Sequence, residues 1–134
     1  MNRIVVAAAL INAHQHVLVQ RRRYGGAHGG LWEFPGGKPE AGEGLSSALV
    51  RELSEELAIA VSPADLTPLI FSSIDLGHEK GSLLLLLYLC HIWAGDPLPL
   101  AAEEVRWVSA VSLAALEMPP ADVPLVASVA ALLG

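Results

Sequence analysis

Cysteine, aromatic residues and charge are all scarce in this chain. Its 134 residues include one cysteine, Cys90, and only 5% of them are aromatic and 16% charged. A single cysteine excludes an intramolecular disulfide, which is typical of a reducing compartment, so we expect a cytoplasmic protein. Cys90 lies within an apolar run, where we expect a plain core residue.

Basic residues are also few. Eight Lys and Arg stand against 14 Asp and Glu, which gives a formal net charge of −6. Proteins that bind DNA or RNA usually present a basic surface, so we expect no nucleic-acid polymer as a partner. A small nucleotide is compatible with this charge, because a divalent cation can neutralise its phosphates.

No apolar run is long enough to span a bilayer as a helix. The apolar stretch 83–90 has 8 residues, whereas a spanning helix needs about 20. Residues 1–13 have Arg3 followed by apolar residues, a weak likeness to an export signal, but their β-branched content favours a first strand. We therefore expect no membrane association.

The remaining composition favours one folded domain over residues 1–134, because 53% of the residues are hydrophobic. A hairpin is predicted around the polar turn 12–16, and the apolar segment 82–93 is predicted as a central strand. The whole pattern predicts an α/β domain with a mixed sheet covered by helices. Extended segments are predicted at 4–11, 17–20, 31–34, 69–74, 82–93 and 105–109, and helices at 45–59, 111–116 and 123–133.

The predicted helix 45–59 contains a cluster of glutamates. Glu52, Glu55 and Glu56 are spaced i, i+3 and i+4, which places their carboxylates on one face. Like charges at this spacing repel by a few tenths of a kcal/mol per pair, and Arg51 offsets part of this through its i+4 partner Glu55. The opposite face is apolar and is expected to face the core: it contains Ala48, Leu49, Leu53 and Leu57.

Such a cluster has two interpretations. A bare ExxEE pattern is more often a solvated acidic face than a binding site. The alternative is a site for a hard cation, because Mg²⁺ and Mn²⁺ favour carboxylate oxygens and are often coordinated by protein carboxylates and substrate phosphates together. A glycine–proline turn before the helix offers backbone carbonyls as neutral ligands, and Glu43 lies near the positive end of the helix dipole.

The spacing of these residues resembles the signature of the Nudix hydrolases: Gly37-x5-Glu43-x7-Arg51-Glu52-Leu53-x-Glu55-Glu56-x-Ala58-Ile59. Residues 31–38 and 119–125 resemble the MutT-like branch, so the similarity covers nearly the whole chain and implies a Nudix-type α/β/α sandwich. One position departs, because the family usually has glycine where Ala58 stands. Positive φ is common at such a helix end, so either the alanine lowers stability or the helix runs on by a residue.

The resemblance implies a magnesium site, with Mn²⁺ as a possible substitute. Its metal ligands would be Glu52, Glu55, Glu56 and the carbonyl of Gly36, with Glu55 and Glu56 as principal ligands and Glu52 as ligand or general base. Arg51 would hold the carboxylates in place. Water of lowered pKa would attack the β-phosphorus of a nucleoside triphosphate, releasing a nucleoside monophosphate and pyrophosphate.

A second departure concerns a further metal ligand. Relatives often have a metal-binding glutamate at the position of Ala101. Glu103, Glu104 or a water would then supply the missing oxygen. The alternative is that both glutamates form a surface acidic pair before a strand.

The resemblance also implies substrate-binding residues, namely Phe34, Lys38, Arg22 and Asp122. A base would stack near Phe34, and Lys38 either reaches a phosphate or is a solvated loop lysine. An ionised Asp122 only accepts hydrogen bonds, from N1–H and N2–H₂ of guanine or N4–H₂ of cytosine. Its alternative role is an N-cap of the last helix.

The segment around Asp122 resembles the CTP pyrophosphohydrolase subgroup. We therefore expect substrates broader than 8-oxo-dGTP, including CTP and 5-methyl-dCTP, and a role in clearing modified nucleotides before they reach DNA. The alternatives are hydrolysis of another nucleoside diphosphate derivative such as ADP-ribose, or a non-catalytic nucleotide-binding module. A monomer or a homodimer is expected.

Overall fold

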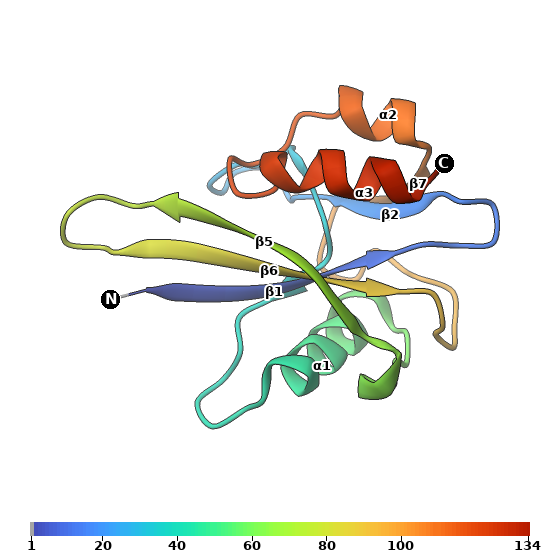
Figure 1. Cartoon of the computed structure of the whole chain (residues 1–134), viewed down its shortest axis with the longest axis horizontal. Helices are drawn as coiled ribbons and strands as arrows, with labels where there is room; N and C mark the ends of the chain where they lie inside the picture. Colours follow the sequence, from blue (N-terminus) through green and yellow to red (C-terminus); the bar gives the residue numbers. More distant parts are fainter. Residues whose placement is uncertain (1) are drawn as a thin grey trace.

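The computed structural model describes residues 2–134, which form two β-sheets with helices on either side (Figure 1). One sheet has four strands in the order β4-β1-β6-β5, and the other has three in the order β3-β2-β7. The strands are β1 Arg3–Leu10, β2 Val17–Arg21, β3 Trp32–Glu33, β4 Gly36–Gly37, β5 Thr67–Asp75, β6 Ser82–Cys90 and β7 Glu104–Val108. The helices are α1 Leu45–Leu57, α2 Ala110–Ala115 and α3 Val126–Leu132, with 3₁₀ turns η1 Pro63–Asp65 and η2 Val123–Leu125.

The four-stranded sheet is mixed, as predicted. Strand β6 lies between β1, to which it is parallel, and β5, to which it is antiparallel, so its predicted central position is confirmed. It ends at Cys90, earlier than the predicted residue 93, because Leu10 and Cys90 are the last register pair with β1. Beyond that pair, the pairing within residues 2–134 is limited to an isolated bridge between Ala94 and Ala60.

The predicted hairpin of β1 and β2 is wrong in its pairing. The turn itself forms, since the Asn12 side-chain oxygen accepts from the backbone N–H groups of His14 and His16, each at 3.0 Å. The two strands meet only at one bridge between Ile11 and Val17 and then enter separate sheets. Both edges of β1 are occupied by β4 and β6, and both edges of β2 by β3 and β7, so neither has an edge left for the other.

The domain has two hydrophobic cores, one on each face of the four-stranded sheet. Alternate side chains of β1 belong to different cores. Ala7 and Ala9 face the core shared with α2 and α3, whereas Val6, Ala8 and Leu10 face the core shared with α1. Figure 1 shows α1 on one side of the strands and α2 with α3 on the other, which confirms the α/β/α sandwich. The predicted apolar stripe of α1 is fully buried: Ala48, Leu49, Leu53 and Leu57.

Two helix ends differ from the prediction. Helix α1 stops at Leu57, and Ala58 takes the left-handed conformation with φ 58°, its N–H donating to the Ser54 carbonyl. Of the two alternatives for this position, the helix therefore ends there and the alanine is strained. The segment 123–133 begins with the 3₁₀ turn η2, which contains Pro124, before α3. Among residues 2–134, no helix has the length and apolar character to cross a membrane.

Candidate active site

An open cavity of about 840 Å³ lies between the two sheets and the segment before η2. It brings together side chains from β3, β4, α1, the loop after β2 and the loop before η2. The predicted site residues among its lining are Arg22, Phe34, Gly36, Lys38, Glu56 and Asp122. The other predicted residues, Arg51, Glu52 and Glu55, do not line it.

The glycine turn, Gly36 and Gly37 of β4, lies between β1 and α1 and allows them to approach each other closely. Gly36 and Gly37 pair with Ala7 and Val6 of β1. A side chain at Gly36 would collide with the Val6 carbonyl, and one at Gly37 would collide with the carboxylate of Glu52. Gly36 therefore allows the close approach of β1, and Gly37 allows the close approach of the Glu52 carboxylate.

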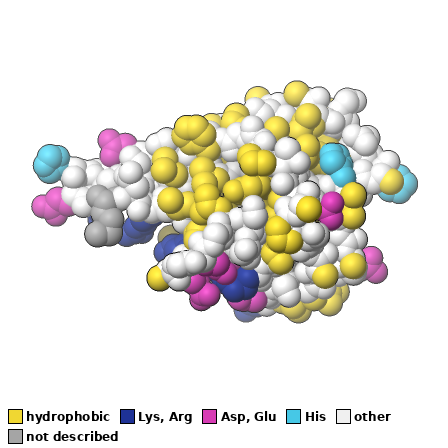
Figure 2. Space-filling model, turned by 60° about the horizontal axis from the view of Figure 1, so that its bottom comes forward, with side chains coloured by type: hydrophobic (Ala, Val, Ile, Leu, Met, Phe, Trp, Pro, Cys, Tyr) yellow, Lys and Arg dark blue, Asp and Glu magenta, His cyan; other side chains and the backbone are white. Residues whose placement is uncertain are grey.

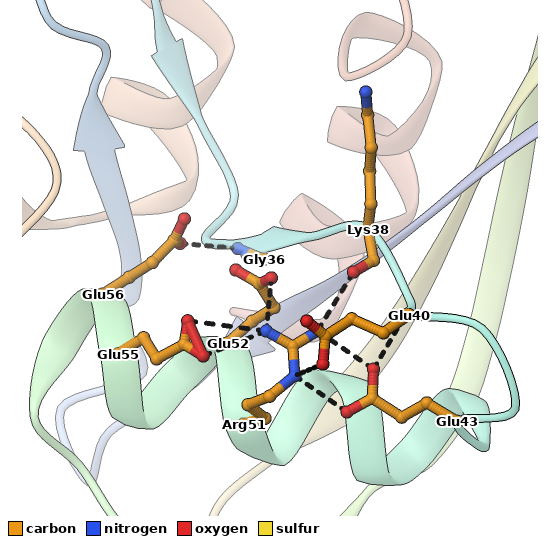
Figure 3. Close-up of polar contacts among 8 residues, drawn as sticks. All are labelled: Gly36, Lys38, Glu40, Glu43, Arg51, Glu52, Glu55 and Glu56. Carbon is orange, nitrogen blue, oxygen red and sulfur yellow. Dashed lines mark hydrogen bonds and ion pairs between the residues drawn. The ribbon is translucent and has the colours of Figure 1, made fainter.

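Arg51 is the centre of an ion-pair network on one side of α1 (Figure 3). Its Nε contacts Glu43 at 2.8 Å, and its Nη1 contacts Glu52 at 2.9 Å and Glu55 at 3.0 Å. Its Nη2 donates to the Lys38 carbonyl at 3.1 Å, which joins the helix to the preceding loop. These hydrogen bonds raise the pKa of Arg51, and its bond to Glu43 is the main cause that lowers the pKa of that carboxyl to about 2.

Figure 2 shows that acidic and basic side chains gather on the face of the molecule that α1 occupies. Glu55 belongs to the exposed part of the network, since 57% of its side chain is accessible, compared with 16% for Glu52. The solvated-face interpretation therefore describes Glu55, whereas Glu52 lies against Gly37, which itself lines the cavity.

Glu56 points in the opposite direction, toward the cavity (Figure 3). Its Oε1 accepts from the Gly36 backbone N–H and from Gln20 Nε2, both at 3.2 Å. These partners are neutral and no ion pair to Glu56 is formed within residues 2–134, so burial dominates and raises its pKa to about 7.

The donor set suits a hard divalent cation. Glu56 is a half-buried carboxylate that forms no ion pair within residues 2–134, and Glu52 is adjacent to the glycine turn. Both offer oxygen ligands of the type that Mg²⁺ prefers. In the arrangement of residues 2–134, no three acidic, histidine or cysteine side chains form a ready-made metal group. Arg51 engages Glu52 and Glu55, so a cation bound there would compete with these ion pairs.

The predicted substrate residues occupy the other parts of the cavity. Arg22 pairs with Glu33 at 2.7 Å, and the Lys38 ammonium extends away from the Arg51 network (Figure 3). Lys38 makes no ion pair with any residue in 2–134. Both cations thus line the cavity without contacting the carboxylates of α1.

Asp122 is only 6% exposed, and its Oδ2 accepts from the Phe34 backbone N–H at 3.2 Å. It makes no side-chain cap to η2, so the N-cap alternative is wrong. Burial raises its pKa to about 7, so the protonated carboxyl is populated at neutral pH. The acceptor-only expectation applies to the ionised form of Asp122, and the protonated carboxyl also donates a hydrogen bond.

The position of the absent family glutamate, Ala101, lines the cavity. Neither neighbouring glutamate does. Glu103 accepts from the Tyr24 backbone N–H at 3.3 Å, and Glu104 pairs with Arg21 at 3.6 Å and with Arg106 at 3.4 Å. Their geometry corresponds to the surface-pair alternative.

Sequence reasoning missed two residues of the site, Gln20 and Glu33. They are register partners on β2 and β3, and their side chains bond at 3.2 Å. A signal was present, because the alternation of residues 17–20 places Gln20 on the same face as the buried Leu18. A polar residue at such a position requires a partner.

Comparison with known proteins shows the family to which the chain belongs. The NUDIX domain family matches residues 1–129. The chain is 36% identical over 122 residues to a protein of Mycobacterium tuberculosis named putative 8-oxo-dGTP diphosphatase 2, covering 91% of this chain and 84% of that protein. It is 32% identical over 137 residues to the CTP pyrophosphohydrolase of Escherichia coli, covering 98% and 95%.

A solved MutT structure, from work on Aliivibrio salmonicida and Vibrio cholerae, superposes with a TM-score of 0.81 at 32% identity, covering 98% of both chains. The family match, the sequence relatives and the fold superposition thus each cover nearly the full length of the chain. The chain belongs to the Nudix hydrolase family and to its MutT-like branch.

Proposed function

We propose that this enzyme hydrolyses nucleoside triphosphates to a nucleoside monophosphate and pyrophosphate with Mg²⁺, or Mn²⁺ in its place. The observation that supports this most is the composition of one cavity: Glu56 and the glycine turn line one part, and Phe34 with Asp122 lines another. Cation-binding oxygens and a base-binding pocket thus face the same space. Relatives named 8-oxo-dGTP diphosphatase and CTP pyrophosphohydrolase support the substrate class.

Glu56, Glu52 and the carbonyl of Gly36 would hold the cation, and Glu55 would join after leaving Arg51. When bound, Mg²⁺ supplies a Lewis acid that offsets phosphate charge and lowers the pKa of water. Arg22 and Lys38 add positive charge to the cavity and would bind phosphate oxygens. Arg51 would keep Glu52 near the turn.

Asp122 and Phe34 would select the base. Because burial raises the pKa of Asp122 to about 7, its carboxyl can accept from an amino group when ionised and donate to an exocyclic carbonyl oxygen or a ring nitrogen when protonated. This favours a broad range of substrates, including 8-oxo-dGTP, CTP and 5-methyl-dCTP. The resulting role would be removal of modified nucleotides.

The test is a nucleotide panel with Mg²⁺. The triphosphates CTP, dCTP, 5-methyl-dCTP, dGTP and 8-oxo-dGTP are scored separately for pyrophosphate and phosphate release, and ADP-ribose is scored for formation of AMP. Glu56→Gln is expected to abolish turnover, whereas Glu103→Gln, an acidic residue outside the cavity, is expected to retain it. Full turnover by Glu56→Gln would overturn the proposal, and cleavage of ADP-ribose alone would reassign the substrate. Base selection by Asp122 requires that Asp122→Asn change the substrate ranking.

The expected cytoplasmic location, and the expected monomer or homodimer, stay predictions. Size-exclusion chromatography with light scattering would measure the oligomeric state.

A further inference from the structure

Gln20 is a buried polar residue at a position where the strand pattern calls for an apolar one. Val17 and Val19 of β2 face one core, and Leu18 faces the core that contains the apolar stripe of α1. Gln20 follows Leu18 on that face and is only 2% exposed. An apolar side chain at this position would extend the core. The contacts of the Gln20 amide must therefore explain why a polar residue is buried here.

The amide group of Gln20 lies between two carboxylates from different elements. Its Nε2 donates to Glu33 Oε2 of β3 at 3.2 Å and to Glu56 Oε1 of α1 at 3.2 Å. Nitrogen must face them, because the reverse orientation would place the amide oxygen against two acceptors. The other end, Oε1, is buried without a hydrogen-bond partner among the described residues. The fold therefore tolerates an orphaned acceptor in order to bond both carboxylates with one donor group.

These contacts join the two parts of the cavity. Glu33 pairs with Arg22 through its second oxygen at 2.7 Å, and Glu56 is bonded to the Gly36 N–H at 3.2 Å. A chain of contacts therefore connects the Arg22 guanidinium, on the substrate side of the cavity, to the glycine turn. Its members, in order, are Arg22, Glu33, Gln20, Glu56 and Gly36.

We propose that Gln20 is a positioning residue that fixes Glu56 relative to the Arg22–Glu33 pair, so that the metal-binding and substrate-binding parts of the cavity are held together. This inference rests on the proposed function. Gln20 acts through its neighbours, since it does not line the cavity itself. A neutral donor is suited to this place, because a lysine or arginine would neutralise the carboxylate that a cation needs.

The test is Gln20→Met, which keeps the length of the side chain and removes the donor. The readout is the dissociation constant for Mn²⁺ alone, measured by electron paramagnetic resonance on the full chain without nucleotide. Leu18→Met on the same face of β2 is the matched packing control. Removing a residue that orients a metal ligand typically weakens metal binding by about tenfold or more, and we expect this for Gln20→Met and not for Leu18→Met.

Kinetics provide a second readout. The Mg²⁺ concentration for half-maximal rate and the KM for nucleotide are both expected to rise in Gln20→Met, because the link to Arg22 is lost. Mn²⁺ binding within twofold of wild type would overturn the inference while leaving the proposed function intact. Conversely, a wild-type protein that binds Mn²⁺ but hydrolyses no nucleotide would defeat the proposed function alone.

Gln20→Asn covers the case in which the methionine variant does not fold. It keeps an amide but is one methylene shorter, so it cannot reach both carboxylates, and the same loss of Mn²⁺ affinity is expected. If both variants unfold while Leu18→Met remains folded, Gln20 is a residue of the fold and the inference is overturned.

Discussion

Arg51 binds Glu43 through two parallel hydrogen bonds, from Nε to Oε2 at 2.8 Å and from Nη2 to Oε1 at 3.0 Å. The same guanidinium uses its remaining nitrogen for Glu52 and Glu55. One cation thus orders three carboxylates from the helix and from the loop before it. Only the planar fork of arginine can satisfy this geometry, since a lysine ammonium is a single point charge.

Arg51→Lys is therefore expected to lower activity much more than stability. The paired carboxylates would no longer be held at fixed positions, and we expect kcat/KM to fall by about 10–100-fold, as for other residues that orient metal ligands. Ion pairs that water and salt can screen contribute little to stability, so we expect thermal stability to change little. Steady-state kinetics and thermal melts of Arg51→Lys measure the two effects.

Arg106→Lys is the matched control, because Arg106 pairs with Glu104 at 3.4 Å outside the cavity. Its kinetics should equal those of the wild type. Wild-type kcat/KM in Arg51→Lys would mean that the fork has no role in positioning.

Glu43 makes a pH-dependent contribution to stability. Its hydrogen bond from Arg51 lowers its pKa from the usual 4.5 to about 2 in the folded protein. The stabilisation is therefore fully present above pH 4.5 and is lost as the pH falls toward 2. Melting temperatures of wild type and Glu43→Gln between pH 2 and 7 should differ at neutral pH and converge at the acidic end. A constant difference over this range would contradict the assignment.

Asp122 shifts stability in the opposite direction. Burial raises its pKa from the usual 3.8 to about 7, so the folded state binds the proton more tightly than the unfolded state. Stability therefore falls as the pH rises from about 4 through 7. Asp122→Asn removes the buried charge and should stabilise the protein at pH 8 by up to about 4 kcal/mol, the upper bound for a shift of this size.

Denaturant titrations at pH 4 and pH 8 check this effect of Asp122→Asn. Asp75→Asn is the control, because Asp75 is exposed and its oxygen accepts from the Gly77 N–H, a bond that asparagine also makes. An unchanged pH dependence in Asp122→Asn would show that the pKa of this carboxyl is the same in the folded and unfolded protein.

The glutamate helix could be predicted from the sequence because its information is local. The i, i+3, i+4 spacing and the apolar stripe ending at Leu57 follow from helical periodicity alone. The division into two sheets could not be predicted in this way. The local sequence of residues 4–11 and 17–20 is typical of a hairpin. The strands that pair with β1 instead, β4 and β6, come from distant parts of the chain.

The environments of the site residues were the least predictable part. The protonation of Asp122 depends on its burial beside Phe34, 88 positions away, and the pairing of Gln20 with Glu56 joins residues 36 positions apart. Spacing within one helix identifies which carboxylates are neighbours along it. Which of them faces the cavity, as Glu56 does, and which faces solvent, as Glu55 does, is decided by packing between elements.

Ala58 gives a prediction that concerns stability alone. It holds the left-handed conformation with φ 58° at the end of α1, where a Cβ atom is strained by about 1–2 kcal/mol. Ala58→Gly relieves that strain but raises the entropy of the unfolded state, at a cost of about 0.5–1 kcal/mol, so we expect a net stabilisation of up to about 1.5 kcal/mol. Ala60→Gly is the control, because Ala60 has no positive φ and glycine there should destabilise. Urea unfolding of both variants measures the difference, and a destabilised Ala58→Gly would mean that the methyl group of Ala58 makes packing contacts worth more than the strain.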